Sequence, residues 1–205
     1  VQEVITLGKL ITERKFDATR VVAIVGESIE KPQYARTMIG AKLSELLAGQ
    51  QSEEGDRWIS GDVLSGKTKK KDGFLNFYDD QLTVIPEGDQ LTLFGWLLGG
   101  KLKPSTSRTL PGFYMQNNRF KVNTNTNGEE RAFVVTGQYE QMLPMDIFPQ
   151  HLMKAILTQD FEKMEGLGIY ELVEEDVALC EFACTSKQPL QHILRSGLDV
   201  MREQG

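Results

Sequence analysis

The chain has 205 residues, enough to bury a real hydrophobic core in one large domain or two small ones. Its apolar share of 40% is ordinary for a folded, soluble protein, and its formal net charge of −6 argues against nucleic acid as the main partner, because phosphate binding needs clustered Lys and Arg. No run approaches the length of a membrane-spanning helix, and no signal peptide opens the chain. The chain starts at Val1 without a methionine, and we expect it to be part of a longer polypeptide.

Residues 1–100 are predicted to form one compact α+β domain. Apolar alternation and β-branched runs favour strands, and the leucine spacing of residues 41–48, bracketed by glycines, predicts one short helix. Gly61 inside a strand indicates a bulge or a close backbone approach. The expected strands are residues 1–10, 21–26, 36–39, 58–65 and 82–85. Strands around one helix suggest a β-grasp-like arrangement, and another small α+β fold stays open as the alternative.

Residues 101–144 are predicted to be an irregular connector. Asparagine, threonine and glycine dominate the tract at 123–128, which is typical of a turn. Phe120–Val122 and Arg131–Val135 flank this tract, so we expect them to pair as a β-hairpin with Asn127 and Gly128 near its tip.

Residues 145–205 are predicted to form a small bundle of four short antiparallel helices. The first starts at Met145 with Pro149 in its first turn, and the second runs from Asp160 to the glycines at 166–168. The third spans 173–184 and the last about 189–202. The apolar stripes expected to face the core are Leu152, Ile156 and Leu157 on the first helix and Leu190, Ile193, Leu194, Leu198 and Met201 on the last.

Both cysteines lie in the third of these helices. Val173, Val177, Cys180 and Cys184 fall at i, i+4, i+7 and i+11, which places them on one helix face. We expect the two cysteines to be small buried core residues. Side chains at i and i+4 of a regular helix do not meet in disulfide geometry, which argues against a bridge between them.

The cysteine spacing also matches the end of a cluster-binding motif. The ferredoxin pattern C-x2-C-x2-C-x3-C-P, laid backward from Cys184, keeps Cys180 but finds Val177 and Glu174 at its first two ligand positions and Thr185 in place of the proline. The chain has no third cysteine, so we predict that it carries no iron–sulfur cluster. A zinc site would need two more ligands, for which the only histidines are His151 and His192.

Residues Gly61–Thr68, GDVLSGKT, satisfy the phosphate-loop pattern G-x4-G-K-[ST]. A working phosphate loop follows a buried strand and opens a helix, whereas here an acidic loop precedes the match and the basic run Lys67–Lys71 follows it. We therefore predict that the segment binds no nucleotide and that the lysines form a solvated loop tip, with docking to an acidic partner as the alternative. The chain shows no nucleophile–base pair, complete metal set or dinucleotide fingerprint, so no catalytic, cofactor-binding or metal-ligating residue is predicted.

The amino-acid sequence resembles that of the C-terminal half of the A subunit of the Na⁺-translocating NADH:quinone oxidoreductase, the Nqr complex. The resemblance covers essentially the whole chain. The similar stretches are VITLGKLITE, RVVAIVGESIEKPQYARTMIGAKLSELLAG, ISGDVLSGK, LFGWLLGG, NTNTNGEERA, YEQMLPMDIFP and LGIYELVEEDVALCEFACTSK. It implies a soluble-ligand-binding β-grasp (SLBB) domain in residues 1–100 and, in 145–205, a helical domain like the cluster-carrying domains of related redox subunits. Those relatives keep all their cysteines, and this chain departs from them at Glu174 and Val177.

The resemblance also implies a function. It indicates a peripheral subunit on the cytoplasmic face of the bacterial inner membrane, in a complex that passes electrons from NADH to ubiquinone and pumps sodium ions. That complex uses flavins and iron–sulfur centres, none of which this part of the chain is expected to hold. Two hypotheses follow: a structural subunit that docks to the other Nqr subunits, or a small-molecule module that binds quinone.

Overall fold

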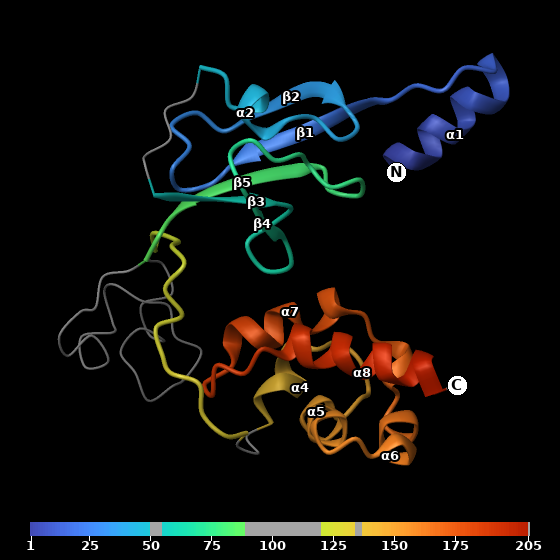
Figure 1. Cartoon of the computed structure of the whole chain (residues 1–205), viewed down its shortest axis with the longest axis vertical. Coiled ribbons are helices and arrows are strands. Elements are labelled where there is room, and N and C mark those ends of the chain that lie inside the picture. The colour runs from blue at the N-terminus through green and yellow to red at the C-terminus, as the bar shows by residue number, and fades with distance from the viewer. Residues whose placement is uncertain (50–54, 89–119, 134–136, 205) are drawn as a thin grey trace. The chain divides into compact units, whose positions relative to one another are not determined.

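The computed structural model describes residues 1–49, 55–88, 120–133 and 137–204. The chain divides into two compact units, Val1–Asn125 and Thr126–Gly205, shown from blue to yellow and from yellow to red in Figure 1. In its described residues the first unit holds a mixed sheet and two helices, and the second unit is helical, so the expected α+β class is confirmed. Among the helices of the described residues, none is both long enough and apolar enough to cross a bilayer.

The first unit is built on a five-stranded sheet in the order β2-β1-β5-β3-β4. Its strands are β1 Thr19–Val25, β2 Gln33–Met38, β3 Asp56–Ser60, β4 Lys67–Lys69 and β5 Gln81–Pro86. β1 runs parallel to β5, and the other three pairings are antiparallel. The strands expected at 21–26, 36–39 and 82–85 are therefore confirmed, with small shifts at their ends.

The core of this unit lies between one face of the sheet and the helix α2, Leu43–Leu46. Val22 and Ile24 of β1 and Leu82 and Val84 of β5 alternate with residues of the opposite face and are fully buried. Leu43 packs against them with no exposed surface, which confirms the short helix expected at 41–48, although it makes little more than one turn.

The strand expected at residues 1–10 is wrong, because these residues begin a helix, α1, Gln2–Glu13. Ile5 and Leu7 alternate with polar neighbours, but Val4, Leu7 and Ile11 at i, i+3 and i+7 also fit a helical stripe, and the helical period is the one that forms. The Gln2 side chain of this helix bonds to the backbone of β1. Its amide donates to the Val21 carbonyl at 3.1 Å and accepts from the Val21 N–H at 3.0 Å.

The strand expected at 58–65 ends at Ser60 instead. Gly61 has φ of 96°, and the Asp62 carboxylate accepts hydrogen bonds from the backbone N–H groups of Leu64 and Ser65, so the chain turns. A Cβ on Gly61 would lie 3.1 Å from the Gly66 Cα, which confirms a close backbone approach rather than a bulge. The returning strand β4 contains Lys67 and Lys69, so the lysine run lies partly on the edge of the sheet and not wholly in a loop tip. Lysines on an edge strand discourage pairing with other chains.

The predicted hairpin around Asn127 and Gly128 is also wrong, since residues 120–133 contain no strand. The backbone bonds of this segment go elsewhere. In the expected turn, the Thr124 N–H donates to the Pro86 carbonyl at 3.3 Å, and in the second arm the Arg131 N–H donates to the Ser186 carbonyl at 2.8 Å. The turn is thus bonded to the first unit and the second arm to the second unit, which leaves little to drive a hairpin. The last two residues of the second arm, Val134 and Val135, lie outside the described residues.

The second unit contains α4 Gln138–Met142, α5 Pro149–Leu157, α6 Phe161–Gly166, the 3-10 turn η2 Ile169–Glu171, α7 Glu174–Ala183 and α8 Leu190–Gln204. All four predicted helices are confirmed, and α4 and η2 are additional. The Asp160 side chain accepts the Lys163 N–H at 3.2 Å and so caps α6. Leu157 is 56% exposed, so the prediction that it faces the core is wrong. Val173, predicted to lie on the same helix face as the cysteines, precedes α7 and is 51% exposed. The buried core is formed by Leu152, Met153, Ile156, Met164, Ile169, Leu172, Val177, Cys180, Cys184, Leu190, Ile193 and Leu194, among others.

Candidate functional site

The helix α7 presents the cysteine segment, and its sequence fixes where it starts. The Asp176 carboxylate accepts the N–H of Val173, the residue before the helix, at 2.9 Å. Three acidic residues, Glu174, Glu175 and Asp176, occupy the first turn, where negative charge is favourable next to the unpaired N–H groups. The helix ends at Ala183, so Cys184 lies just after its last turn.

Both thiols lie in the core of the second unit, as the sequence predicts. Cys180 and Cys184 are exposed by 0% and 1%, and neither is in a disulfide. The Tyr139 hydroxyl lies 2.8 Å from Cys184 Sγ, and Cys180 Sγ donates to the Tyr139 carbonyl at 3.5 Å. The N–H of Gln188 donates to Cys184 Sγ, also at 3.5 Å. The two cysteines and Tyr139 thus join α4, α7 and the start of the α7–α8 connection.

Burial raises the pKa values of Cys180 and Tyr139. Removal from water raises the pKa of the Cys180 thiol to about 11, and the nearby Glu140 carboxylate adds to the shift. Burial, together with the hydrogen bond to Cys184, raises the pKa of the Tyr139 hydroxyl well above its usual range. Because the thiolate is the form that attacks electrophiles and binds metals, the environment of Cys180 favours a structural role.

The other positions of the cluster motif do not converge on the thiols. The Glu174 carboxylate forms a two-point ion pair with the Arg195 guanidinium of α8, and Val177 is fully buried in the core. His151 and His192 are exposed, whereas the thiols are buried. Across residues 1–49, 55–88, 120–133 and 137–204, no group of three or more His, Cys, Asp and Glu side chains is arranged to hold a metal ion. The absence of an iron–sulfur cluster stays a prediction.

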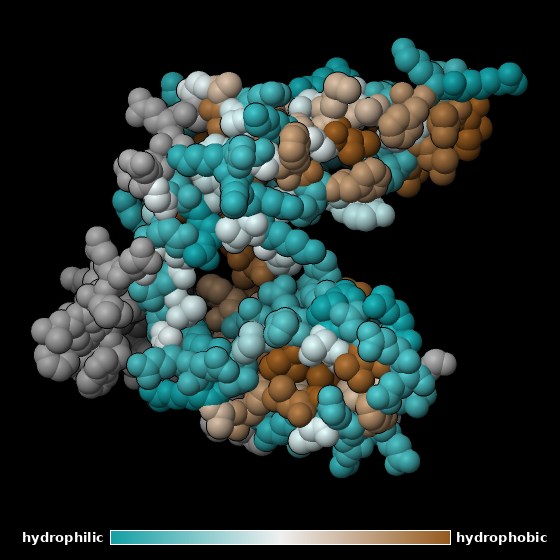
Figure 2. Space-filling view, in the orientation of Figure 1, coloured by the Kyte–Doolittle hydropathy of each residue, from teal (hydrophilic) through white to brown (hydrophobic). Residues whose placement is uncertain are grey.

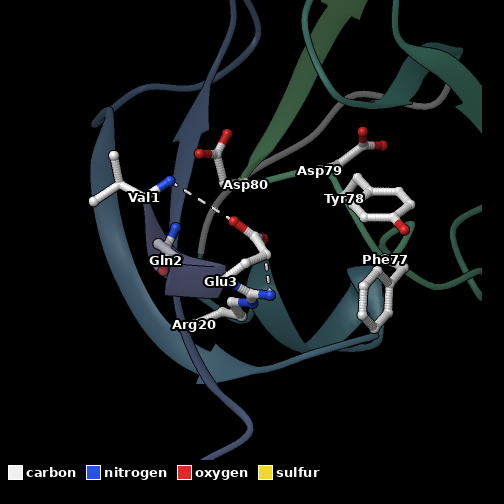
Figure 3. Close-up of a pocket in the computed structure, with 8 residues that line it drawn as sticks. All are labelled: Val1, Gln2, Glu3, Arg20, Phe77, Tyr78, Asp79 and Asp80. Carbon is white, nitrogen blue, oxygen red and sulfur yellow. Dashed lines mark ion pairs between the residues drawn. The ribbon is translucent and has the colours of Figure 1, made fainter. Parts of the chain in front are cut away.

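A small hollow in the first unit gathers residues that the sequence did not single out. It has a volume of about 190 Å³ and is lined by Val1, Gln2, Glu3, Arg20, Phe77, Tyr78, Asp79 and Asp80. In Figure 3 the Glu3 carboxylate lies between the Val1 amino group, 3.8 Å away, and the buried Arg20 guanidinium, 2.9 Å away. The aromatic and acidic run Phe77–Asp80 is the one feature of the sequence that could have indicated this hollow. Nothing in that run predicts that residues of α1 lie beside it. The volume is below the ~300 Å³ at which small-molecule pockets begin.

A larger, open depression lies in the second unit. It has a volume of about 410 Å³ and is lined by His151, Lys154, Ala155, Thr158, Lys163 and Leu167. Lys163 Nζ pairs with Asp160 at 2.5 Å, and that carboxylate raises the pKa of the lysine. Because Lys163 is paired with Asp160, the polar groups that the depression offers to a ligand are the ring nitrogens of His151 and the ammonium of Lys154. Ala155 and Leu167 supply apolar surface beside them.

The segment Gly61–Thr68 does not have the surroundings of a phosphate loop. A buried strand does precede it, contrary to the expectation, because Trp58 and Ile59 of β3 are exposed by 4% and 6%. Thr68, however, lies in the strand β4, and the described residues 69–88 that follow contain no helix. Without a helix N-terminus there is no ready-made set of N–H groups for phosphate oxygens. That the segment binds no nucleotide stays a prediction.

Comparisons with known proteins connect this architecture to one subunit of a redox complex. Residues 21–71 match the family model described as the NQRA C-terminal domain, of SLBB type. The chain is 39% identical over all its 205 residues to the A subunit of the Na(+)-translocating NADH-quinone reductase of Neisseria meningitidis. The chain is a homologue of the C-terminal half of that protein. It is 40% identical, again over its full length, to the A subunits of the same enzyme from Yersinia pestis and Shewanella frigidimarina. The match covers 46% of each relative, so the chain spans about half the length of the curated relatives it matches.

Proposed function

We propose that the protein serves as the A subunit of a sodium-pumping NADH:quinone reductase. Within that subunit, we propose that the part that corresponds to this chain has a docking and structural role. In this proposal the subunit is peripheral and lies on the cytoplasmic face of the membrane. Its partners are the other subunits of the complex, which carry the flavins, the iron–sulfur centre and the pathway for sodium ions.

The observation that carries the proposal is the identity of about 40% over the whole chain to proteins named as this subunit. The similarity covers both the sheet unit and the helical unit. Both units are therefore expected to belong to the same subunit of the complex. The raised pKa of the Cys180 thiol, the burial of both thiols and the small volume of the hollow beside Arg20 favour docking over chemistry within this part of the chain.

The helix α7 supplies a surface for such docking. Val177 and Cys180 face the core, yet Leu179 and Phe182 on the same helix are exposed by 41% and 55%. A helix that is apolar on more than one side is usually covered on more than one side. We infer that the outward side of α7 lies in an interface with another subunit.

Copurification tests both the proposed membership of the complex and the proposed interface on α7. The intact subunit, tagged and coexpressed with the other subunits, is expected to elute with them in fixed ratio, whereas Leu179→Ser/Phe182→Ser is expected to lose most of that association. The matched control is Leu157→Ser on α5, which is similarly exposed. Unchanged copurification of the double variant would reject the α7 interface, and failure of the wild-type protein to associate would reject the proposed function.

Quinone binding is the second candidate. The depression beside His151 and Lys154 is large enough for a small ligand and offers hydrogen-bond donors to carbonyl oxygens. Titration of the purified chain with a short-chain quinone tests this candidate directly. Saturable binding that His151→Ala/Lys154→Ala abolishes would support it, and a linear, non-saturating response of the wild-type protein would reject it.

A further inference from the structure

The helix α1 is attached to its own unit through its polar side. Its residues Gln2, Thr6, Lys9 and Glu13 lie along one side of the helix at helical spacing. Two residues of this side bond to the start of β1 and the segment before it: Gln2 to the Val21 backbone, and Lys9 to Asp17 at 2.5 Å. In the first turn, Glu3, which lies off this side, pairs with Arg20 at 2.9 Å. The Arg20 side chain is buried, and Figure 3 shows it directed at Glu3.

The apolar side of α1 faces outward. Val4, Ile5, Leu7, Leu10 and Ile11 are exposed by 72%, 54%, 56%, 41% and 71%, and no residue of the helix is buried. Figure 2 shows these hydrophobic side chains gathered at the upper right, over the helix. This is the reverse of an ordinary surface helix, in which the apolar side packs on the core and the polar side meets water. An apolar patch of this kind marks an interaction surface.

Two other occupants fit this surface less well. A second copy of the chain would bring together two patches of at most ~600 Å² each, the upper range for a monomer. Their total of ~1,200 Å² only reaches the lower limit of a stable interface, and the 12-residue α1 supplies five aliphatic side chains toward it. An anionic lipid surface would need a basic rim around the apolar side. The one cation within the helix, Lys9, is already paired with Asp17, and Glu3 is paired with Arg20. The exposed Arg14 and Lys15 follow the helix at one end and do not form a rim along its apolar side.

The remaining occupant is protein that accompanies this chain in the subunit. The relatives have 54% of their length outside the match, since the chain covers 46% of them. We propose that the outward apolar face of α1, formed by Val4, Ile5, Leu7, Leu10 and Ile11, docks onto the part of the A-subunit polypeptide to which this chain has no counterpart, whether one polypeptide or two carry the parts. The proposal rests on the proposed function, because it takes the partner from the same subunit.

Hydrogen exchange of the α1 amides gives a local test. One sample is the chain alone, and the other is a chimera in which this chain replaces the matching part of the Neisseria meningitidis relative. We expect the α1 amides to exchange at least about tenfold more slowly in the chimera, because covering the apolar face suppresses local opening. In the same chimera, Leu7→Asp/Ile11→Asp is expected to return the exchange to the rate of the chain alone.

The control variant is Val63→Asp, an apolar residue 48% exposed in the turn between β3 and β4, which should leave the slow exchange unchanged. Amides of β1 report in every sample whether the sheet unit is folded. If the chimera does not fold, pull-down of the chain by the separately expressed remainder of the relative decides: wild type should bind, and the double variant should not.

Three results would overturn the proposal: equal α1 exchange in the chain and the chimera, slow exchange already in the chain alone, or slow exchange that appears only at high concentration, which would indicate a second copy. The other subunits of the complex are absent from both samples. A negative result here therefore rejects the docking of α1 without rejecting the proposed function, which the copurification experiment tests separately.

Discussion

The contact between Tyr139 and Cys184 predicts that the two cysteines differ in their contribution to stability. Cys180→Ala removes one buried sulfur and leaves a small cavity, which is expected to cost about 1 kcal/mol. Cys184→Ala leaves a similar cavity and also removes the sulfur 2.8 Å from the Tyr139 hydroxyl. A buried hydroxyl left without its partner adds about 1–3 kcal/mol, so we expect a total of about 2–4 kcal/mol.

A double-mutant cycle separates the hydrogen bond from the cavity. Tyr139→Phe removes the hydroxyl, and Tyr139→Phe/Cys184→Ala removes both partners. The double variant is expected to cost about 1 kcal/mol less than the sum of the two single variants, because no unpaired hydroxyl remains.

Urea unfolding followed by two signals assigns the effect to the helical unit. In a Trp96→Phe background the remaining tryptophan is Trp58, which lies buried in β3, so its fluorescence reports on the first unit, whereas far-UV circular dichroism is weighted toward the helices of the second. The variants should shift the circular-dichroism transition and leave the fluorescence transition in place. Equal costs for Cys180→Ala and Cys184→Ala, together with additive single variants, would refute the reasoning.

Three further predictions follow. The raised pKa values of Cys180, about 11, and Tyr139 mean that the unfolded chain loses these protons first, so the free energy of unfolding should fall as pH rises above about 8.5, and urea titrations at pH 8 to 10.5 should show a shallower fall for Cys180→Ala. Gly26→Ala should prevent stable folding of the sheet unit, measured by tryptophan fluorescence, because Gly26 has φ of 129° and a Cβ would lie 2.0 Å from the Val84 carbonyl oxygen. Anaerobically purified chain should contain no stoichiometric iron or acid-labile sulfide, and a visible charge-transfer band would contradict the two-cysteine argument.

The helical unit could be read from the sequence because its signals are local. Pro149 and Asp160 mark helix starts, and the apolar stripe of α8 has the helical period over its whole length. The burial of Cys180 and Cys184 followed from the same spacing. Val173 does not share this burial because it precedes the first turn, where the helical period no longer decides which way a side chain points.

The errors concern segments whose partners are remote. In residues 1–10 both periods were present, and the helix is fastened by Arg20 and by the Val21 backbone, contacts that no local pattern contains. The hairpin failed because Thr124 and Arg131 bond to different units. The Tyr139–Cys184 contact joins residues 45 positions apart, so the sequence offered no route to it.

Complementation tests most directly whether the protein works within a sodium-pumping NADH:quinone reductase. A bacterium that lacks its own A subunit would be given the Neisseria meningitidis relative with this chain in place of the matching residues. Membrane vesicles from that strain should recover sodium-stimulated quinone reduction by NADH, whereas vesicles with the Gly26→Ala version should not. Correctly folded chimera that is present at normal levels but restores no sodium-stimulated activity would contradict the account.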